Sequence, residues 1–377
     1  MNKDIKEALF PVIRRGLGLP AEDLPLPTEV CRSLLRFGEG QSILPIIYKG
    51  LEKMDAPREC LDEFREEYFG CIYDFMNRDL AIKQISSLLD SEKIHYILLK
   101  GAVLQHLYPS PELRTSCDLD ILVKEDDLDR ACAAVERGTD FKYRRRSYHN
   151  LILEGPEIVL ELHFSIRENE EKLDTLLSRA WEYAVPCKGG SGFCFTPEYQ
   201  IFYITAHMAH HLLHGGIGIR PFIDLWLLNN RTVFDEQEVR HMCESCGILT
   251  FYEESMRLSR VWLEGTGHTE TSEMFEGICL SGGVLGSDKF RNAARQREKR
   301  GVSYIAGRIF PPPYEVRELY KDDDGREHSL PYYYAKRLLS WTGKERREHL
   351  GRQIKTILTS DGDYIEDAGD LLNRLKL

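Results

Sequence analysis

The feature that most constrains the fold is a short segment of strand, glycine turn, helix and strand in a chain that is otherwise helical in pattern. Ile94–Leu99 is a nearly continuous apolar run, which is typical of a strand buried on both faces. Gly101 follows, and Ala102–Tyr108 has the spacing of a short helix that ends at Pro109. Cys117–Val123 is a second strand candidate. This order predicts a small α/β unit.

Further elements are expected around this segment. Glu125–Arg137 has the pattern of an amphipathic helix stopped by Gly138, and the alternating runs Ser147–Glu154 and Glu157–Phe164 predict a hairpin. Leu61–Leu89 has the pattern of one long helix. Its expected buried positions are Tyr68, Ile72, Phe75, Leu80, Ile85 and Leu88.

These patterns predict an α+β protein in which a small mixed-sheet core is flanked by helical regions. We expect an N-terminal helical region at residues 1–91, the α/β core at 92–188, and a C-terminal helical region at 189–377. The 377 residues, 42% hydrophobic and 29% charged, have the length and composition of an ordinary globular protein with substantial cores.

Composition and charge narrow the class of protein. No apolar run approaches the roughly 20 residues of a membrane span, and the charged N-terminus does not resemble a secretory signal. The ten cysteines are scattered at irregular spacing, which indicates buried thiols in a reducing compartment, so we expect a cytoplasmic protein without a membrane partner. The Cys243-x-x-Cys246 pair stands alone in a helical stretch, which favours buried helix cysteines over zinc. The net charge of −11 disfavours general binding of duplex DNA.

Two basic runs stand out against that acidic balance. Lys142–Arg146 and Lys289–Arg300 are either solvated faces or islands that steer an anionic acceptor or nucleotide into a cleft. A substrate that carries phosphate therefore stays possible for this acidic chain.

Three acidic side chains are candidates for a catalytic centre. Asp118 and Asp120 open an apolar strand, and side chains two apart on a strand point to the same face. Paired carboxylates suit one or two magnesium ions, although this pair also fits a solvated strand end. Glu161 is a polar position in another apolar strand and shares a face with His163. If the two strands lie side by side, Glu161 is placed to activate an attacking hydroxyl.

Residues before the acidic pair suit phosphate binding. Gly101 lets an anion approach the backbone at the start of the following helix. Arg114 and Ser116 share the strand parity of Asp118, so an extended backbone places them on the same face. The forked donors of Arg114 could hold a phosphate there, and the alternative is an arginine on a surface loop. His163 either orients the substrate or Glu161, or packs in the core.

The order of strand, glycine, helix, Asp-x-Asp strand and later acidic strand resembles the polymerase-beta-type nucleotidyltransferase superfamily. Residues 98–108 (LLKGAVLQHLY), followed by Arg114 and residues 118–123, are similar to a large, poorly characterised bacterial branch with a Lys-Gly…Asp-x-Asp motif. His207, His211 and residues 220–225 (RPFIDL) resemble the helical region of that branch.

The resemblance implies transfer of a nucleoside monophosphate from a nucleoside triphosphate to an acceptor hydroxyl or phosphate, with Mg²⁺ or Mn²⁺ as cofactor. It implies that Asp118 and Asp120 bind the metal and that Glu161 completes the metal and catalytic site. The nucleotide-binding residues that it implies are Lys100, Gly101, Arg114, Ser116, His163, His207, His211 and Asp224. It names no acceptor, which could be a small molecule, a protein or an RNA.

The sequence alone leaves three points open. Most superfamily members carry Gly-Gly or Gly-Ser where this chain has Lys100-Gly101, so Lys100 either contacts phosphate or marks an altered triphosphate cradle. An altered cradle would suit a nucleotide-binding or sensing protein without turnover, and a helical adaptor with an incidental Asp-x-Asp is the third interpretation. Asp224 could pair with Arg220 across one helical turn.

A row of histidines raises a separate question. His207, His210, His211 and His214 fall along one side of a predicted helix. They form either an independent metal site or, as we favour, a helix on which His207 and His211 border the nucleotide cleft.

Overall fold

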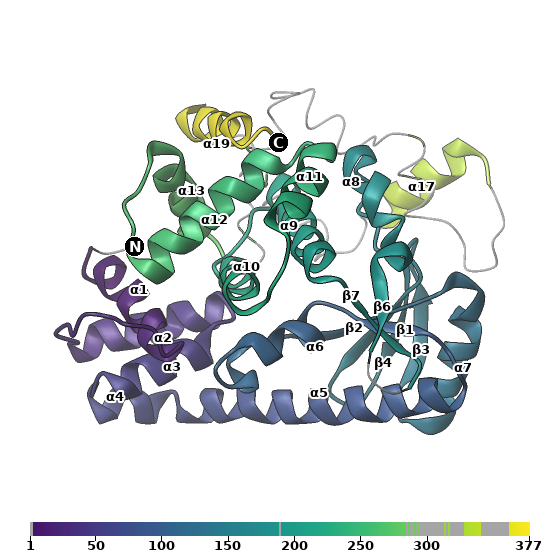
Figure 1. Ribbon diagram of the computed structural model, residues 1–377, viewed down its shortest axis with the longest axis horizontal. Coiled ribbons are helices and arrows are strands. Elements are labelled where there is room, and N and C mark those ends of the chain that lie inside the picture. Colours follow the sequence, from purple (N-terminus) through teal and green to yellow (C-terminus); the bar gives the residue numbers. More distant parts are fainter. Residues whose placement is uncertain are drawn as a thin grey trace.

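The fold is known from a computed structural model. The structure describes residues 3–187, 190–283, 328–340 and 362–377, with isolated positions between 286 and 316. Figure 1 shows a sheet on one side of the molecule, one long helix along an edge, and most other helices packed above. No helix in the described part of the chain is long and apolar enough to cross a membrane. The basic run Lys289–Arg300 lies largely outside the described residues.

The strands form a seven-stranded mixed sheet in the order β3-β4-β5-β2-β1-β7-β6. The strands are β1 (Tyr96–Leu98), β2 (Asp118–Val123), β3 (Lys142–Arg146), β4 (Asn150–Glu154), β5 (Val159–His163), β6 (Ala184–Pro186) and β7 (Gly192–Phe195). β2 is antiparallel to β1 and parallel to β5, and β4 and β5 form an antiparallel hairpin. The α+β class, the two predicted strands and the hairpin are therefore confirmed.

Three strands, β3, β6 and β7, were not expected from the sequence. The basic run Lys142–Arg146 is β3, an edge strand whose residues are all exposed. Charged side chains on an edge strand oppose pairing with another chain, which explains why this strand lacks the apolar alternation that marks the others. β7 pairs in parallel with β1, so the sheet draws on residues beyond position 188.

Helices precede and follow the sheet. The N-terminal helices are α1 (Lys3–Gly16), α2 (Thr28–Gly40), α3 (Leu44–Lys53), α4 (Arg58–Glu63) and α5 (Arg65–Ser91). Between the strands lie α6 (Gly101–Leu104), α7 (Leu128–Gly138) and α8 (Glu171–Leu177). The C-terminal helices are α9 (Pro197–His214), α10 (Arg220–Arg231), α11 (Glu236–Ser245), α12 (Leu249–Glu264), α13 (Glu270–Ser281), α17 (Leu330–Ser340) and α19 (Gly362–Arg374).

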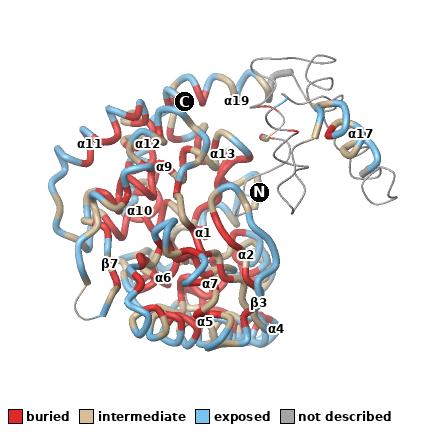
Figure 2. Tube along the Cα trace, turned by 90° about the vertical axis from the view of Figure 1, so that its right-hand side faces the viewer, coloured by how far each residue is buried: buried red, intermediate tan, exposed pale blue. Residues whose placement is uncertain are grey.

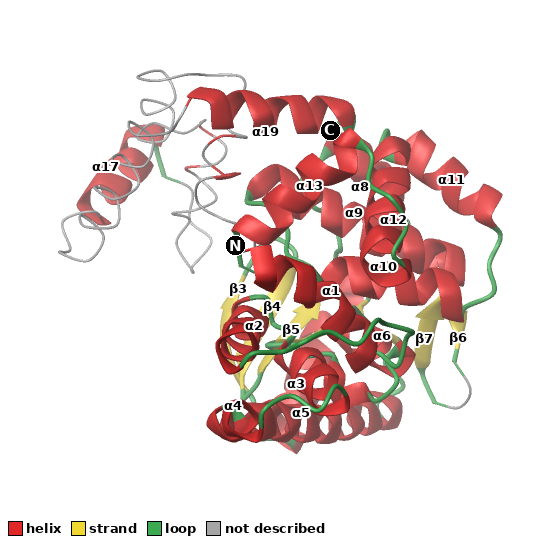
Figure 3. Ribbon diagram, turned by 90° about the vertical axis from the view of Figure 1, so that its left-hand side faces the viewer, coloured by secondary structure: helices red, strands yellow, loops and turns green. Residues whose placement is uncertain are grey.

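The N-terminal and C-terminal helices share one hydrophobic core (Figures 2 and 3). The ring of Phe10 in α1 stacks on Trp262 in α12 with ring centroids 5.0 Å apart. The buried Gln41 amide donates to the carbonyl of Cys279 at 3.1 Å and accepts from the Ile219 N–H at 2.9 Å. The helical regions that flank the sheet in sequence are thus joined in space.

Successive side chains of β2 point to opposite faces of the sheet, because side chains alternate along a strand. Leu119, Ile121 and Val123 pack with α5 and α7 in a core that is separate from the helical one. Asp118 and Asp120 project from the other face. One strand therefore anchors the sheet on α5 and presents two carboxylates on the side away from it.

The predicted helix Leu61–Leu89 is wrong in two respects. It consists of α4 and α5, because Phe64 between them has non-helical angles (φ −109°, ψ 15°). Leu80, predicted to be buried, is 62% exposed. The face of α5 that packs on the sheet is defined by Ala81, Ile82 and Ile85, and Leu80 lies on the opposite side.

The expectation that every cysteine is a thiol is wrong for one pair. Cys187 and Cys194 form a disulfide across the β6–β7 hairpin, with Cα atoms 5.8 Å apart. The other eight cysteines lie in described residues and are free. Cys243 and Cys246 are buried in and directly after α11, as expected for helix cysteines.

Candidate active site

Asp120 is the buried centre of the candidate site. It lies on β2, next to Glu161 in the register with β5, and its side chain is 2% exposed. Its Oδ1 accepts from Lys100 Nζ at 3.2 Å and from His163 Nε2 at 2.8 Å. Burial alone would raise the pKa of Asp120, but the charges and hydrogen bonds of Lys100 and His163 hold it well below the usual range. Asp120 is therefore an ionised, buried carboxylate.

Lys100 reaches Asp120 from the turn between β1 and α6. Its backbone angles, φ 42° and ψ −112°, lie in a region that L-residues rarely adopt. Burial opposes its charge, yet the Asp120 carboxylate more than offsets this and raises the pKa of Lys100. The ammonium group is thus a cation that lies beside the acidic strand β2.

Gly101 tolerates no side chain at this turn. A Cβ there would lie 2.7 Å from Arg114 Nη1 and 2.8 Å from Ser116 Oγ. The predicted phosphate cradle is smaller than the sequence implies, because α6 has only four residues. The N–H groups of Ala102 and Val103 already donate to the carbonyls of Leu99 and Lys100, at 3.2 Å each. Any phosphate at Gly101 therefore depends mainly on side-chain cations.

Glu161 and His163 lie on the same face of β5, as predicted. His163 Nε2 is 3.3 Å from Glu161 Oε2, and Asn150 Nδ2 donates to that same oxygen at 2.6 Å. The hydrogen bond from His163 lowers the pKa of Glu161 despite partial burial. Burial would lower the pKa of His163, but its bonds to Asp120 and Glu161 raise it. His163 thus bridges the two carboxylates as a shared donor.

Asp118 is the more accessible of the two aspartates. It is only partly buried, and Ser116 Oγ lies 3.3 Å from its Oδ1. Arg78 of α5 donates to the backbone carbonyl of Ser116 at 2.6 Å, which fixes the loop before β2. The sequence thus correctly groups Ser116 with Asp118.

Arg114 is neither a surface arginine nor a freely offered phosphate ligand. Its Nε and Nη2 donate to Asp224 Oδ1 and Oδ2 at 3.0 and 2.9 Å, and both side chains are buried. The expected pairing of Asp224 with Arg220 is therefore wrong; Arg220 Nη1 donates instead to the Thr115 carbonyl at 3.0 Å. Tyr108 also donates to Asp224, at 2.8 Å. Nη1 of Arg114 is the guanidinium nitrogen that faces Gly101.

The predicted histidine row lies on α9 and contacts the loop after β5. His207 Nδ1 donates to Glu168 Oε1 at 2.7 Å, and the Nε2 atoms of His207 and His211 lie 2.9 Å apart. Burial would raise the pKa of Glu168, but the bond from His207 lowers it to about 2. Burial, reinforced by His207, lowers the pKa of His211 to about 3. The ionised Glu168 carboxylate and the neutral His211 imidazole thus contact His207 from opposite sides at the edge of the site.

Residues that the sequence did not indicate complete the site. Glu168 and Tyr203 are close enough to Lys100 for its charge to influence their pKa values, and burial raises that of Tyr203. Nothing in the sequence marks Glu168, which lies in a loop. Tyr203 has a usable signal, because it precedes His207 by one helical turn and shares its side of α9.

The donor atoms allow a test of metal binding. Two described sets of three residues bring ligand atoms within 4.8 Å of one another: His149, Glu161 and His163, and Glu170, His210 and His214. Asp118 and Asp120 belong to neither set. Their carboxylate oxygens nevertheless have the hard-ligand chemistry that magnesium prefers, on one face of β2. Lys100 Nζ lies 3.2 Å from Asp120 Oδ1, so the ammonium group is the cation that contacts this carboxylate in the structure.

The fold and this constellation define the class. A mixed sheet carries two aspartates on a central strand, a third acid on the parallel neighbour, and a glycine turn before a short helix, which is the arrangement that the resemblance to nucleotidyltransferases predicts. A family model described as uncharacterised nucleotidyltransferase matches residues 29–264, well over half of the chain, and the protein belongs to this family. No curated protein and no solved structure gives a match.

Proposed function

We propose that this protein is a magnesium-dependent enzyme that transfers a nucleoside monophosphate from a nucleoside triphosphate to an acceptor hydroxyl or phosphate and releases pyrophosphate. The observation that carries the proposal is the pairing of Asp120 with Glu161 across β2 and β5, with Asp118 on the same face. Membership of the nucleotidyltransferase family supports the reaction class.

Asp118 and Asp120 would hold the metal, which when bound supplies charge neutralisation to the triphosphate. Lys100 Nζ neutralises Asp120 from a distance of 3.2 Å. It is free to pair with a phosphate oxygen once Asp120 has another counter-charge, because the flexible lysine stem allows its ammonium group to turn. Lys100 can therefore contact a phosphate, and its pairing with Asp120 also alters the triphosphate-binding turn. Both interpretations of this residue are compatible with the contact.

Glu161 is the residue best placed to accept the proton of the attacking hydroxyl. Its lowered pKa keeps it ionised at neutral pH. Asn150 and His163 bind only Oε2, and among the described residues no hydrogen bond reaches Oε1. A fixed carboxylate with one open oxygen is suited to orient and deprotonate an acceptor.

The remaining predicted residues act around this centre. Arg114 presents Nη1 beside Gly101 for a phosphate, and Asp224 holds the guanidinium in that orientation through two hydrogen bonds. His207 and His211 are proposed to border the nucleotide beyond Glu168. The expected cytoplasmic location and the division into three regions stay predictions.

Binding of MgATP and MgGTP to the wild type, Asp118→Asn and Asp120→Asn by isothermal titration calorimetry tests the metal assignment. We expect each variant to bind at least tenfold more weakly. Asp129→Asn is the matched control, because Asp129 is exposed on α7 and lies at the other face of the sheet. Equal binding by the wild type and both site variants contradicts the proposal.

A nucleotide-binding protein without turnover is a second candidate, and one observation favours it. Asp120 already has two hydrogen-bond donors, the Lys100 ammonium group and His163 Nε2, and the Lys100 charge neutralises the carboxylate without metal. Pyrophosphate release distinguishes the two functions in a panel of small-molecule, protein and RNA acceptors, with Mg²⁺ or Mn²⁺. Release that depends on Glu161 supports the enzyme, whereas tight nucleotide binding without release supports the sensor.

A further inference from the structure

The exposed side of α5 carries a row of large apolar side chains. Phe69, Tyr73, Met76 and Leu80 are 56, 54, 56 and 62% exposed, and we refer to them as the α5 stripe. Their spacing of four, three and four residues keeps them on one side of a helix. Other exposed large apolar side chains in the described residues lie apart from this row, so the α5 stripe is a continuous patch and not scattered surface.

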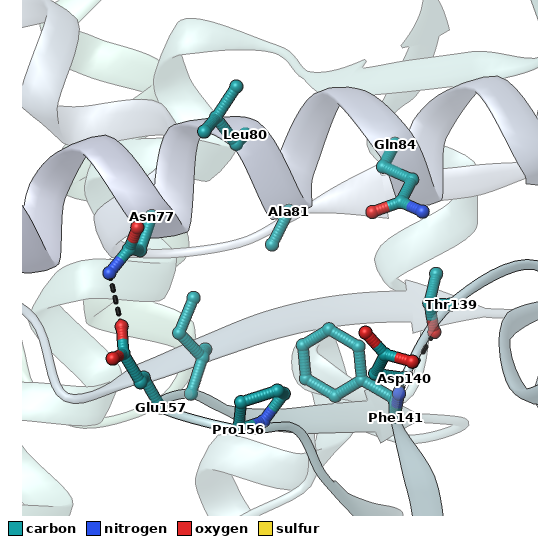
Figure 4. Close-up of a pocket in the computed structure, with 10 residues that line it drawn as sticks. Asn77, Leu80, Ala81, Gln84, Thr139, Asp140, Phe141, Pro156 and Glu157 are labelled. Carbon is teal, nitrogen blue, oxygen red and sulfur yellow. Dashed lines mark hydrogen bonds between the residues drawn. The ribbon is translucent and has the colours of Figure 1, made fainter.

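The α5 stripe lies opposite the face of α5 that packs on the sheet. α5 runs along the edge of the molecule in Figure 1. Leu80 lines a pocket of about 210 Å³ on the flank of the helix together with Phe141 and Pro156, and Figure 4 shows its side chain pointing away from these two residues. Tyr73 is held in place by its hydroxyl, which donates to Glu157 Oε1 at 3.1 Å. The helix therefore presents a fixed apolar ridge with open space beside it.

The spacing is that of a heptad seam. With Tyr73 and Leu80 at a positions and Phe69 and Met76 at d positions, the preceding a position is Glu66 and the following d position is Lys83. Both are exposed. An apolar seam bounded by one acidic and one basic residue is complementary to a reversed copy of itself.

We propose that the chain forms a homodimer in which two α5 helices pair antiparallel about a two-fold axis between Tyr73 and Met76. In this register Tyr73 of one copy contacts Met76 of the other, and Phe69 contacts Leu80. Glu66 then faces Lys83 of the second copy at both ends of the seam. The interface is isologous, as the common two-fold dimer requires.

Charge selects this arrangement over the alternatives. A parallel pair would place Glu66 against Glu66 and Lys83 against Lys83, so both ends of the seam would repel. An antiparallel pair shifted by one heptad would leave part of the stripe uncovered and would set Lys83 against Tyr73. On the flanks of the proposed register, Asp79 faces Ile72, and no like charges meet.

The area is sufficient for a dimer. A side chain of this size has roughly 200 Å² of surface, so the observed exposures leave about 110 Å² on each of the four residues. Two copies then cover roughly 900 Å² from the α5 stripe alone, and the flanking residues bring the total above the ~1,000 Å² expected of a specific interface.

Sedimentation velocity of the full chain at 1–100 µM tests the dimer. We expect a species of twice the 43.6 kDa chain mass that Met76→Glu and Phe69→Glu convert to monomer. Val233→Glu is the control, because Val233 is a 95% exposed apolar residue on a loop outside the stripe, and it should remain dimeric. A monomeric wild type, or a dimer that both stripe variants leave intact, overturns the proposal.

A charge exchange tests the antiparallel register. Glu66→Lys and Lys83→Glu should each weaken the dimer at least tenfold, because each sets like charges against one another. The double variant restores the opposite pairing and should return the dissociation constant to within threefold of the wild type. In a parallel dimer each of these residues faces its own copy, so a single charge reversal replaces one like-charge pair with another. Equal dimerisation of the wild type, the two single variants and the double variant therefore overturns the antiparallel register. Circular dichroism confirms that each variant is folded.

Discussion

Replacing Lys100 with methionine tests the electrostatic core of the site. Methionine keeps the length and the apolar stem of the side chain but removes the ammonium group that lies 3.2 Å from Asp120 Oδ1. Asp120 then depends on His163 alone. We expect Lys100→Met to unfold more easily without magnesium, and added magnesium to stabilise the variant more than the wild type.

The magnitude follows from the burial of the two groups. Removing one partner of a fully buried ion pair costs about 3–5 kcal/mol. His163 remains within 2.8 Å of Asp120, and the Lys100 side chain is 22% exposed, so water can replace part of the lost interaction. These two features reduce the expected loss to about 2 kcal/mol, or roughly 2–3 °C in melting temperature for a chain of this size.

Differential scanning fluorimetry over a magnesium titration measures both effects. Saturating magnesium should recover most of the loss, because a ligand present at 100 times its Kd adds about 2.7 kcal/mol. Lys3→Met, which removes an 84% exposed partner of Glu7, should change stability by less than about 0.5 kcal/mol. A magnesium response identical in Lys100→Met and wild type would refute the reasoning that ammonium and metal neutralise the same carboxylate.

Four further substitutions probe the surroundings. Gly101→Ala places a Cβ 2.7 Å from Arg114 Nη1 and should cost about 1–2 kcal/mol in urea unfolding and weaken MgATP binding at least tenfold in calorimetry. Asp224→Asn leaves the buried Arg114 without its counter-charge and should cost about 3 kcal/mol in urea unfolding. Glu161→Gln should reduce pyrophosphate release by about 10² or more with nucleotide affinity changed less than threefold. The pKa of His211 is about 3 when folded, below its ordinary 6.5, so only the unfolded chain binds this proton as the pH falls through 6.5. This histidine should thus contribute about 2 kcal/mol to the loss of stability between pH 7 and pH 5, and His211→Gln should reduce the loss by that amount.

Matched controls separate these effects from general sensitivity to substitution. Gly277→Ala adds a methyl group where nothing lies within 4 Å on an exposed helix surface, and should not destabilise. Asp370→Asn breaks an exposed pair with Arg374 and should cost less than about 0.5 kcal/mol. His241→Gln, on the exposed side of α11, should keep the wild-type pH dependence. If a control matches its site variant, the corresponding contact does not act as described.

The elements that position the site were predictable because their patterns are local. Short apolar runs that follow turn residues mark β1 and β2, and alternation marks the β4–β5 hairpin. The face shared by Asp118 and Asp120 follows from the period of a strand alone. The parallel register that sets Asp120 beside Glu161 is different, because it depends on the crossover between β2 and β5 and has no local signal.

Partners that are far apart in the sequence were not predictable either, because no local pattern indicates which residues will be in contact. Arg114 and Asp224 are 110 residues apart, and periodicity on α10 suggests only the neighbouring Arg220. Leu80 was misassigned because α5 has apolar residues on two sides, one for the sheet and one in the α5 stripe, and a single helical period cannot distinguish them. The Cys187–Cys194 disulfide requires knowledge of the β6–β7 hairpin, whose short strands have no clear alternation.

Lys100 connects the backbone of the site with its chemistry. A residue with a side chain at φ 42° and ψ −112° costs about 1–3 kcal/mol, which glycine would avoid. Glycine at this position would also remove the cation from Asp120 and leave that buried carboxylate with His163 alone. The interaction of its ammonium group with the buried Asp120 carboxylate therefore offsets the backbone strain of Lys100. The same residue brings Nζ to 3.2 Å from Asp120 Oδ1 and directly precedes Gly101, so the electrostatics of Asp120 and the proposed binding of nucleotide depend on one side chain.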